Sequence, residues 1–413
     1  MTPHHEPTTS LPVDPNLATG QGGTASWADI ERRLAPYFVR AAPRQRALAY
    51  LRGLRSSAER KTSWQLAEVS GEATPDGFQH VLGRADWEAD ALRDARRRDM
   101  VPQRGDPDGV LGLDETGFPK KGRHSAGVAR QDSGTAGRIE HGQIGVFLGY
   151  AGRLGHALRE RELYGPQEWT DDRERGRQAG IPDERRLATK PQLARQMLAR
   201  ALGAGVLAKW VTGDSVDGDD RRLRRWLEAQ PQGYVLAVSG QEDVWLGWQQ
   251  RQVKTTLAAL PEAGWTRRSA GDGAKGPRWD DGCWLARADP VEPHWRRWLL
   301  VRRRVSAPTE LRAYVVFAPA ATTLEEVVRV AGTRWTIASG MEAAKGAGGV
   351  DPDDVRRWIG WYRHLTLALW ALALLAVMRA GAIAVEALQK TLRPAPERSS
   401  LAAFKASRGL PCR

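Results

Sequence analysis

Short apolar segments alternate with helical segments through the middle of this 413-residue chain. Five strands are expected from apolar segments. They are VLGL from 110, two strands within GQIGVFLGYAGRLGHALRERELYGP from 142, WVT from 210 and YVLAV from 234. Helical patterns separate them, notably KPQLARQMLARAL from 190 and DRRLRRWLEAQ from 220. Strands that alternate with helices predict an α/β core in which the helices cover a sheet.

Other patterns flank this core. Residues 26–103 show apolar residues at spacings of three and four, which predicts a small helical domain, and the segment 64–82 is typical of a helix-turn-helix that could bind DNA. The turn sequence RGDPDG at 104–109 precedes the core, which we expect to span 104–380.

Two irregular stretches and two tails complete the expected organisation. Residues from about 240 to 312 are rich in Trp and Gly and predict a β-rich insertion, after which AYVVFAP at 313–319 resumes the strand pattern. Helices are expected at 323–331, 335–346 and 353–378. Residues 1–25 have the composition of a disordered tail, and 381–413 are expected to form a C-terminal tail.

The chain is basic. It has 62 Lys and Arg against 49 Asp and Glu, a net charge of +13, and 52 of the basic residues are Arg. Such an excess favours a polyanionic partner, and nucleic acid is favoured over an anionic membrane because no basic amphipathic helix stands out. The preference for Arg over Lys has two open explanations, bidentate phosphate binding and GC-rich codon usage.

Cysteine content and apolar runs constrain the compartment. Cys283 and Cys412 are too few for a disulfide framework or a thiolate metal site, which fits a reducing environment. Residues 1–25 lack the features of a signal peptide. The apolar run from Leu365 to Met378 falls short of the roughly 20 residues of a membrane-spanning helix, so a buried helix and a cytoplasmic protein are expected.

Two acidic residues follow strands of the expected core. Asp114 and Asp214 stand where side chains of an α/β sheet converge on a shared crevice. Oxygen ligands suit Mg²⁺ or Mn²⁺, and two ions about 3.5–4 Å apart would stabilise the attacking and leaving oxygens of a phosphodiester displacement. The alternative for each residue alone is a turn or a helix cap.

Several strings in order along the chain resemble bacterial insertion-sequence transposases of the DDE type. They are LDETGFPKKG (113–122), SGTAGRIEHGQIGVF (133–147), ELYGP (162–166), WVTGDS (210–215), RWTI (334–337) and RRWIGWYRH (356–364). The resemblance spans most of 27–380. It implies a ribonuclease H-like core and a bacterial, nucleoid-associated protein. The implied activity is DNA transposition, with double-stranded element ends and target DNA as partners. A homodimer in the DNA complex is compatible with this activity.

Carried over motif by motif, the resemblance puts the first catalytic Asp on Asp114 and the second on Asp214. The third carboxylate of the family would stand four residues after Arg334, but Ala338 occupies that position. Lys345 falls on a basic position that holds transposon-end DNA in the wider group. The two-ion site is therefore expected to be compromised, because one metal ion would lose a ligand. Glu342, one turn further along, is a distant substitute.

Other residues carry open alternatives. Lys120, Lys121 and Arg123 could contact phosphates near the cleavage site or form a solvated hairpin. Asp217, Asp219 and Asp220 make the loop after Asp214 acidic, or cap the next helix. The Trp residues of 240–312 could stack on unpaired bases, although core packing is favoured for most of them.

Three functions remain open on sequence grounds. The first is a transposase that cleaves DNA with Mg²⁺. The second is a catalytically inactive relative that binds DNA ends as a repressor or remnant, which Ala338 favours. The third, an unrelated metal-dependent phosphohydrolase, is disfavoured by the order of the motifs.

Overall fold

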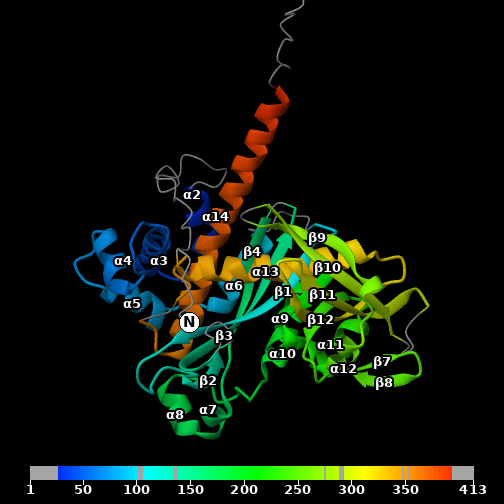
Figure 1. Cartoon of the computed structure of the whole chain (residues 1–413). Helices are drawn as coiled ribbons and strands as arrows, with labels where there is room; N and C mark the ends of the chain where they lie inside the picture. The colour runs from blue at the N-terminus through cyan, green and yellow to red at the C-terminus, as the bar shows by residue number, and fades with distance from the viewer. Residues whose placement is uncertain are drawn as a thin grey trace, which may run out of the picture.

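The computed structural model describes residues 27–99, 106–133, 138–153, 155–273, 276–287, 293–346, 348–351 and 354–392. The N-terminal helices gather around the long helix α14 (Trp358–Leu392) on one side of the molecule, and a large sheet occupies the other side (Figure 1). The expected tails at 1–25 and beyond 392 lie outside the described residues.

Five α-helices and one short 3-10 helix make up the N-terminal unit. They are α2 (Trp27–Leu34), η1 (Ala35–Tyr37), α3 (Ala41–Leu54), α4 (Ser63–Val69), α5 (Asp76–Gly83) and α6 (Ala89–Asp99). The Thr62 side chain accepts a hydrogen bond from the Gln65 backbone and so starts α4. A turn joins α4 to α5, as the helix-turn-helix pattern predicts.

The N-terminal unit shares its core with the rest of the protein. Leu51, Phe78 and Leu92 are buried in one cluster with Phe147 of the sheet and with Trp370 of α14. The apolar run from Leu365 to Leu374 is thus largely buried by neighbouring helices. None of the helices within the described ranges is long and apolar enough to cross a membrane.

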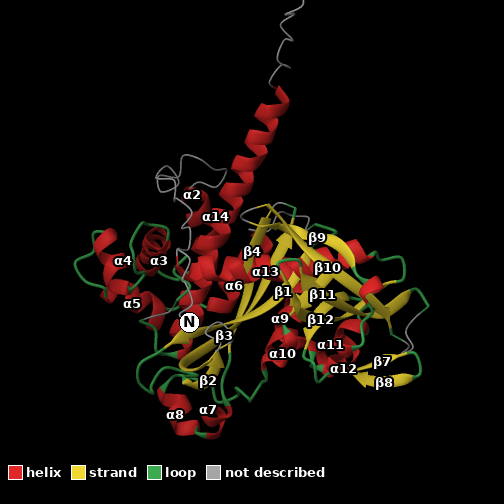
Figure 2. Ribbon diagram, viewed as in Figure 1, coloured by secondary structure: helices red, strands yellow, loops and turns green. Residues whose placement is uncertain are grey.

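Ten strands form one mixed sheet (Figure 2). Its path runs β2-β3-β1-β5-β6-β12-β11-β10-β9, and β4 pairs with β3 off this path. The first six strands in the chain are β1 (Val110–Pro119), β2 (Ala129–Ser133), β3 (Arg138–Gly152), β4 (Gly155–Leu163), β5 (Trp210–Gly213) and β6 (Gly233–Val238).

Strand direction changes at β1. This strand is antiparallel to β3 and parallel to β5, which is parallel to β6. The connections carry α7 (Gln167–Asp171), α8 (Arg173–Gln178), α9 (Lys190–Gly203), α10 (Ser215–Gly218) and α11 (Arg221–Glu228). A mixed sheet with helical crossovers confirms the predicted α/β class, and it is consistent with a ribonuclease H-like core.

The region from 240 to 312 is β-rich, as predicted, but most of it belongs to the main sheet. Its elements are β7 (Asp243–Leu246), β8 (Gln249–Gln252), α12 (Val253–Ala258), η2 (Glu262–Gly264), β9 (Thr266–Gly273), β10 (Gly276–Ala286) and β11 (Trp295–Arg304). Together with β12 (Ala307–Pro319), β9 to β11 extend the sheet beyond β6, and β7 and β8 form a separate hairpin.

Helices cover both faces of the sheet. Leu198 of α9 and Leu227 of α11 pack with Leu111, Val211 and Leu236 on one face. On the other face, Val327 and Ala331 of α13 (Leu324–Gly346) pack with Val110, Trp210 and Val316. Successive residues of a strand point to opposite faces, so a residue of β1 or β5 with an even number faces α13.

The three helix predictions after residue 320 were wrong in their bounds. The segments 323–331 and 335–346 form the single helix α13, because Gly332, which follows the first segment, does not end the helix but is buried within it against Ala270 of β9. Helix α14 runs to Leu392 and so includes the first residues of the tail expected from 381.

The tryptophans of the β-rich region divide between core and surface. Trp298 is buried, and Trp265, Trp284 and Trp295 pack against the clusters on the two faces of the sheet. The rings of Trp245, Trp248 and Trp279 are exposed. Core packing therefore accounts for four of the seven.

Candidate catalytic site

Asp114 lies within β1, and Asp214 directly follows β5, the parallel neighbour of β1. Gly112 of β1 pairs with Thr212 of β5. Asp114 lies two residues after Gly112, and Asp214 lies two residues after Thr212. Both therefore belong to the side of the sheet that faces α13. The tertiary structure brings together the two carboxylates that the sequence singled out.

The charges of the two aspartates act on each other. Burial raises the pKa of Asp114 to about 6, the positive charge of Arg334 opposes this rise, and the negative charge of Asp214 adds to it. Two carboxylates this close repel each other, and a divalent cation bound between them would relieve that repulsion.

Asp214 is also a helix cap, as the alternative interpretation proposed. Its Oδ1 accepts hydrogen bonds from the backbone N–H of Val216 at 2.9 Å and of Asp217 at 3.4 Å, and this starts α10. The cap uses one oxygen in both of these bonds. It fixes the carboxylate in place while its second oxygen takes no part in the cap.

Helix α13 carries the three residues expected to complete the site. Arg334, Ala338 and Lys345 lie on one face of the helix, because they are four and seven residues apart. The charges of Arg334 and Lys345 both interact with Asp114. Ala338 lies between these two residues and is partly buried. The helical register therefore turns the Ala338 position toward the carboxylates.

Lys345 is engaged with the protein itself. Its Nζ donates to the carbonyl oxygen of Gly117 at 2.7 Å and lies 5.3 Å from the centre of the Phe118 ring. Burial lowers the pKa of Lys345, and nearby carboxylates, Asp351 first, oppose that effect. Lys345 thus ties α13 to β1 just beyond Asp114. Glu342 is exposed, and its charge acts on Lys345.

Glu115, the residue after Asp114, has a partner that sequence reasoning missed. Its carboxylate lies 2.6 Å from Nζ of Lys190, the first residue of α9, on the face of the sheet away from α13. A capping box at Thr189 and Gln192 places Lys190 at the start of this helix. That box is visible in the sequence, but the pairing across 75 residues is not.

The acidic loop after Asp214 has three separate roles. Asp220 caps α11 through the backbone N–H of Leu223, as the alternative interpretation predicted, and Asp219 accepts a hydrogen bond from the backbone of Ser239. Asp217 is buried, and its pKa is raised well above its usual range by burial and by the charges of Asp214 and Glu115. Its side chain packs against Gly213, on the α9 side of the sheet.

The basic residues after β1 lie at the surface. Lys121 and Arg123 are exposed, and the backbone of Lys120 bonds to that of His141, so this segment extends the β1–β3 ladder. Their positions allow contact with a ligand that approaches the end of β1.

A cleft rich in arginine adjoins the site and was not predicted. Its volume is about 570 Å³, and Arg334 of α13 forms part of its wall. Its other basic residues are Arg278, Arg302, Arg304 and Arg312. Asp280 and Glu310 also line the cleft, and Asp280 is paired with Arg302, so five arginines against two carboxylates leave an excess of positive charge. Burial, and then the charges of Arg278, Arg312 and Arg304, lower the pKa of Arg302. The arginines come from three strands and a helix, so their separate positions in the sequence conceal the cluster.

The residues present fit a divalent cation only in part. Asp114 and Asp214 supply oxygen ligands on one face, and their mutual repulsion would be relieved by a cation. Within the described ranges, no group of three or more His, Cys, Asp or Glu residues is placed to hold a metal ion. The side chain of Ala338, at the position where the resemblance puts a third carboxylate, offers no oxygen.

Comparisons with known proteins agree with this geometry. A family model described as DDE superfamily endonuclease matches residues 33–268. The chain is 30% identical over 224 residues to a probable transposase for insertion sequence element IS701 from Microchaete diplosiphon. That match covers 50% of this chain and 54% of the relative, so the chain spans about half the length of the curated relative it matches.

Among solved structures, the NurA nuclease from Sulfolobus solfataricus is similar with a TM-score of 0.30 at 10% identity, over 57% of this chain and 78% of that one. The family assignment does not depend on this weak structural similarity. Because the DDE model matches more than half of the residues, the chain belongs to the DDE superfamily endonuclease family.

Proposed function

We propose that this protein is an insertion-sequence transposase that binds double-stranded DNA and cleaves it with Mg²⁺ or Mn²⁺ held by Asp114 and Asp214. The matched positions of these two residues, in β1 and directly after β5, are the observation that carries the proposal. The family, and the similarity to a probable transposase, support it. Action at element ends, transfer to a target and a homodimer on DNA stay predictions.

The chain's own residues have distinct roles in this proposal. Asp114 and Asp214 hold the cation, and the bond of Asp214 to the start of α10 keeps its carboxylate in place. A bound divalent cation supplies electrostatic stabilisation to the oxygens of a phosphodiester under attack. Arg334 and the arginine cleft beside it bind phosphates of the DNA, and so do Lys120 and Lys121 at the end of β1. Lys345 holds α13 on β1.

The proposal includes weak cleavage, because Ala338 removes one oxygen ligand from the site. A second candidate function follows from the same observation. Ala338, at the position where the resemblance puts a third carboxylate, favours a DNA-binding relative without cleavage that acts as a repressor or remnant. Both candidates require DNA binding, and they differ in strand cleavage.

The test combines binding and cleavage on DNA that flanks the gene. Binding is measured by fluorescence anisotropy in EDTA, and we expect the logarithm of the affinity to fall linearly and steeply with the logarithm of the salt concentration. Cleavage is then measured with Mg²⁺ and with Mn²⁺. Weak cleavage that Asp114→Asn and Asp214→Asn abolish supports the transposase.

The control is Asp108→Asn, which alters an exposed aspartate outside the site and should leave cleavage unchanged. Salt-dependent binding without cleavage by any variant would favour the repressor. Binding that does not respond to salt would reject both functions.

A further inference from the structure

A second basic pocket lies on the α11 side of the sheet. Five arginines and three carboxylates line it, together with Tyr234, Trp245 and Gln250. The arginines are Arg221, Arg224, Arg225, Arg287 and Arg297, and the acids are Glu228, Glu242 and Asp243. Its volume is about 250 Å³, several times the roughly 30 Å³ of a water molecule in the liquid. We call it the α11 pocket.

The α11 pocket and the two aspartates are on opposite faces of the sheet. Asp114 and Asp214 face α13, whereas α11 packs on the other face through Leu223 and Leu227. Arg297 of β11 also belongs to the α11 face, because Leu299, two residues later, packs there. A ligand in this pocket would therefore be separate from the one at the carboxylates.

Each carboxylate of the pocket already has a basic partner. Glu228 lies 2.6 Å from Arg297 and accepts a hydrogen bond from Tyr234 at 2.6 Å. Glu242 lies 2.6 Å from Arg224. Asp243 is 3.9 Å from Arg221. With every acid paired, the pocket retains an excess of two positive charges.

Arg224 has hydrogen-bonding capacity to spare inside this pocket. The residue is only 6% exposed, and its Nη2 donates to Glu242. Its Nη1 is buried without a hydrogen-bond partner. A buried guanidinium nitrogen that donates to nothing costs free energy, and an anion in the pocket would satisfy it.

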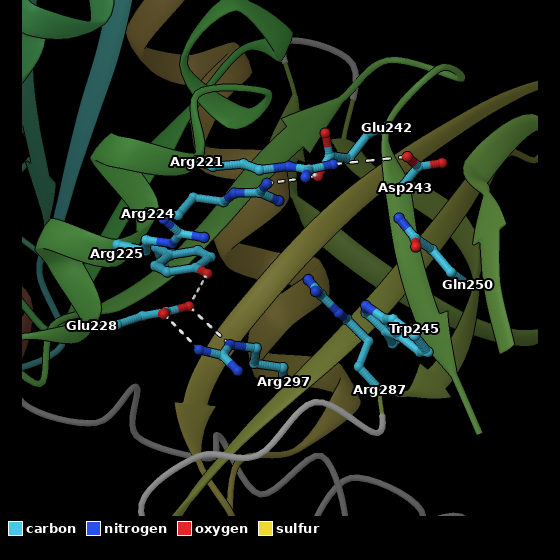
Figure 3. Close-up of a pocket in the computed structure, with 11 residues that line it drawn as sticks. Arg221, Arg224, Arg225, Glu228, Glu242, Asp243, Trp245, Gln250, Arg287 and Arg297 are labelled. Atoms are coloured by element: carbon cyan, nitrogen blue, oxygen red, sulfur yellow. Dashed lines mark hydrogen bonds and ion pairs between the residues drawn. The ribbon is translucent and has the colours of Figure 1, made fainter. Parts of the chain in front are cut away.

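Arg287 lies beside Arg297 at the far wall of the pocket. The backbone N–H of Arg287 donates to the carbonyl of Arg297 at 3.0 Å, so the two side chains leave the sheet as neighbours. Figure 3 shows Arg287 extending toward the space in front of α11, beside the half-exposed ring of Trp245. Arg225 reaches the pocket from the helix.

We propose that the α11 pocket binds a phosphodiester group of DNA, on the face of the sheet opposite the candidate catalytic carboxylates. Guanidinium groups bind phosphate oxygens bidentately, and the ring of Trp245 offers a flat surface to the adjoining nucleotide. DNA is favoured over a small phosphate compound because the chain carries a net charge of +13 and belongs to the DDE superfamily endonuclease family. The inference goes beyond the proposed function, since it requires no metal ion.

The test uses the full chain with the double substitution Arg225→Gln and Arg287→Gln. The matched control is Arg222→Gln, which removes an exposed arginine of α11 that does not line the pocket. Affinity for a short fluorescein-labelled duplex is measured in EDTA between about 50 and 200 mM salt. We expect the double variant to bind severalfold more weakly, with a salt slope less steep by about 0.9 for each lost phosphate contact.

The control variant should keep the slope of the unmodified protein. Circular dichroism melting checks that both variants fold. A variant with Arg225→Gln and Arg287→Lys, which keeps the positive charge at position 287, should bind DNA more tightly than the double variant. Equal slopes in the double variant and the unmodified protein would overturn the proposal. So would an equal loss in the double variant and in Arg222→Gln.

A second arm identifies the source of the phosphate. Inorganic phosphate and adenosine monophosphate are titrated by calorimetry into the unmodified protein and the double variant. Binding of either compound that the double substitution abolishes, with DNA affinity unchanged, would mean that the pocket takes a small anion and not DNA. The DNA titration is repeated with Asp114→Asn present, with and without the double substitution. The double substitution should weaken DNA binding in this background too, so failure of the pocket proposal can be told from failure of the proposed function.

Discussion

Lys190 and Glu115 join α9 to β1 by an ion pair of 2.6 Å, on the face of the sheet opposite Asp114. Both side chains are largely buried, with 19% and 13% of their surfaces exposed. The pair holds the residue directly after the first candidate metal ligand. We therefore expect Lys190 to act on the site as a positioning residue, through the backbone of β1.

Lys190→Met should destabilise the protein and displace Asp114. Glu115 would lose the ammonium group of Lys190, and the loss of a hydrogen bond to a charged group costs about 1.5–3 kcal/mol. Urea denaturation measures this cost. Substituting both residues, as in Lys190→Met with Glu115→Gln, should recover part of the stability because no unpaired charge is left. A double variant less stable than Lys190→Met would argue against this account.

Asp114 should make stability depend on pH between about 4 and 6. Its pKa is about 6 in the folded protein, against an ordinary value of 3.8, so the folded state binds more protons than the unfolded state in this window. The free energy of unfolding therefore falls as pH rises through it, by at most about 3 kcal/mol. Asp114→Asn should remove this dependence in urea titrations in EDTA. An unchanged profile would contradict the assignment of the shift to Asp114.

Ala338→Glu should raise cleavage with Mg²⁺. The position lies between Arg334 and Lys345 on the face of α13 that turns toward Asp114, so the new carboxylate supplies an oxygen near the two aspartates. Gain of one electrostatic catalytic contact is worth about 10²–10³-fold in rate. Ala343→Glu, on the exposed side of the same helix, is the control. Efficient cleavage by the unmodified protein that Glu342→Ala abolishes would assign the ligand to Glu342.

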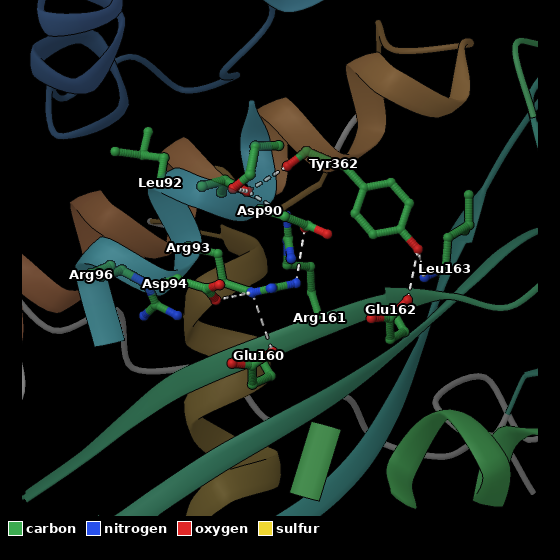
Figure 4. A network of polar contacts seen from close by, with 12 residues as sticks. Asp90, Leu92, Arg93, Asp94, Arg96, Glu160, Arg161, Glu162, Leu163 and Tyr362 are labelled. Atoms are coloured by element: carbon green, nitrogen blue, oxygen red, sulfur yellow. Dashed lines mark hydrogen bonds and ion pairs between the residues drawn. The ribbon is translucent and has the colours of Figure 1, made fainter. Parts of the chain in front are cut away.

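Glu160→Gln should weaken the attachment of the N-terminal helices. Glu160 of β4 is fully buried and lies 2.6 Å from Arg97, 3.0 Å from Arg200 and 3.7 Å from Arg93 (Figure 4 shows Arg93 and Glu160). Removing one partner of a buried charge pair costs about 3–5 kcal/mol. Urea denaturation should show that loss, and Glu174→Gln at the surface should show none. A change below about 1 kcal/mol would contradict the role given to Glu160.

The N-terminal helices are predicted to recognise DNA, but a truncation that removes them would also break the contacts of Glu160. Truncation near residue 103 would remove α6 and leave Glu160 without two of its arginines. Substitution of Gln79 and His80 by Ala, on the exposed side of α5, avoids this damage. Loss of a base contact should reduce discrimination for end DNA by about 1–3 kcal/mol, measured against random duplex. Unchanged discrimination would assign recognition to another surface.

Local patterns determined much of the fold. The apolar segments at 110 and 210 have the composition of buried strands, so the sequence predicted β1 and β5. Asp214 directly follows β5 as expected, but Asp114 does not end its strand, because the pairing of β1 with β3 continues to Pro119. The bounds of α13 were missed because helical periodicity places the buried face of a helix more reliably than its ends. The β-rich region was recognised, but its union with the main sheet depends on the pairing of β12 with β6.

The sequence by itself determined which residues could carry chemistry: Asp114, Asp214 and the alanine where a third carboxylate is expected. Only the tertiary structure decided that both aspartates face α13, that Lys345 is bound to Gly117, and that Lys190 pairs with Glu115. It also gathered the arginines of the α11 pocket from a helix, a strand and a strand end. The reason is physical: periodicity is set by neighbours along the chain, whereas charge contacts depend on packing between distant segments.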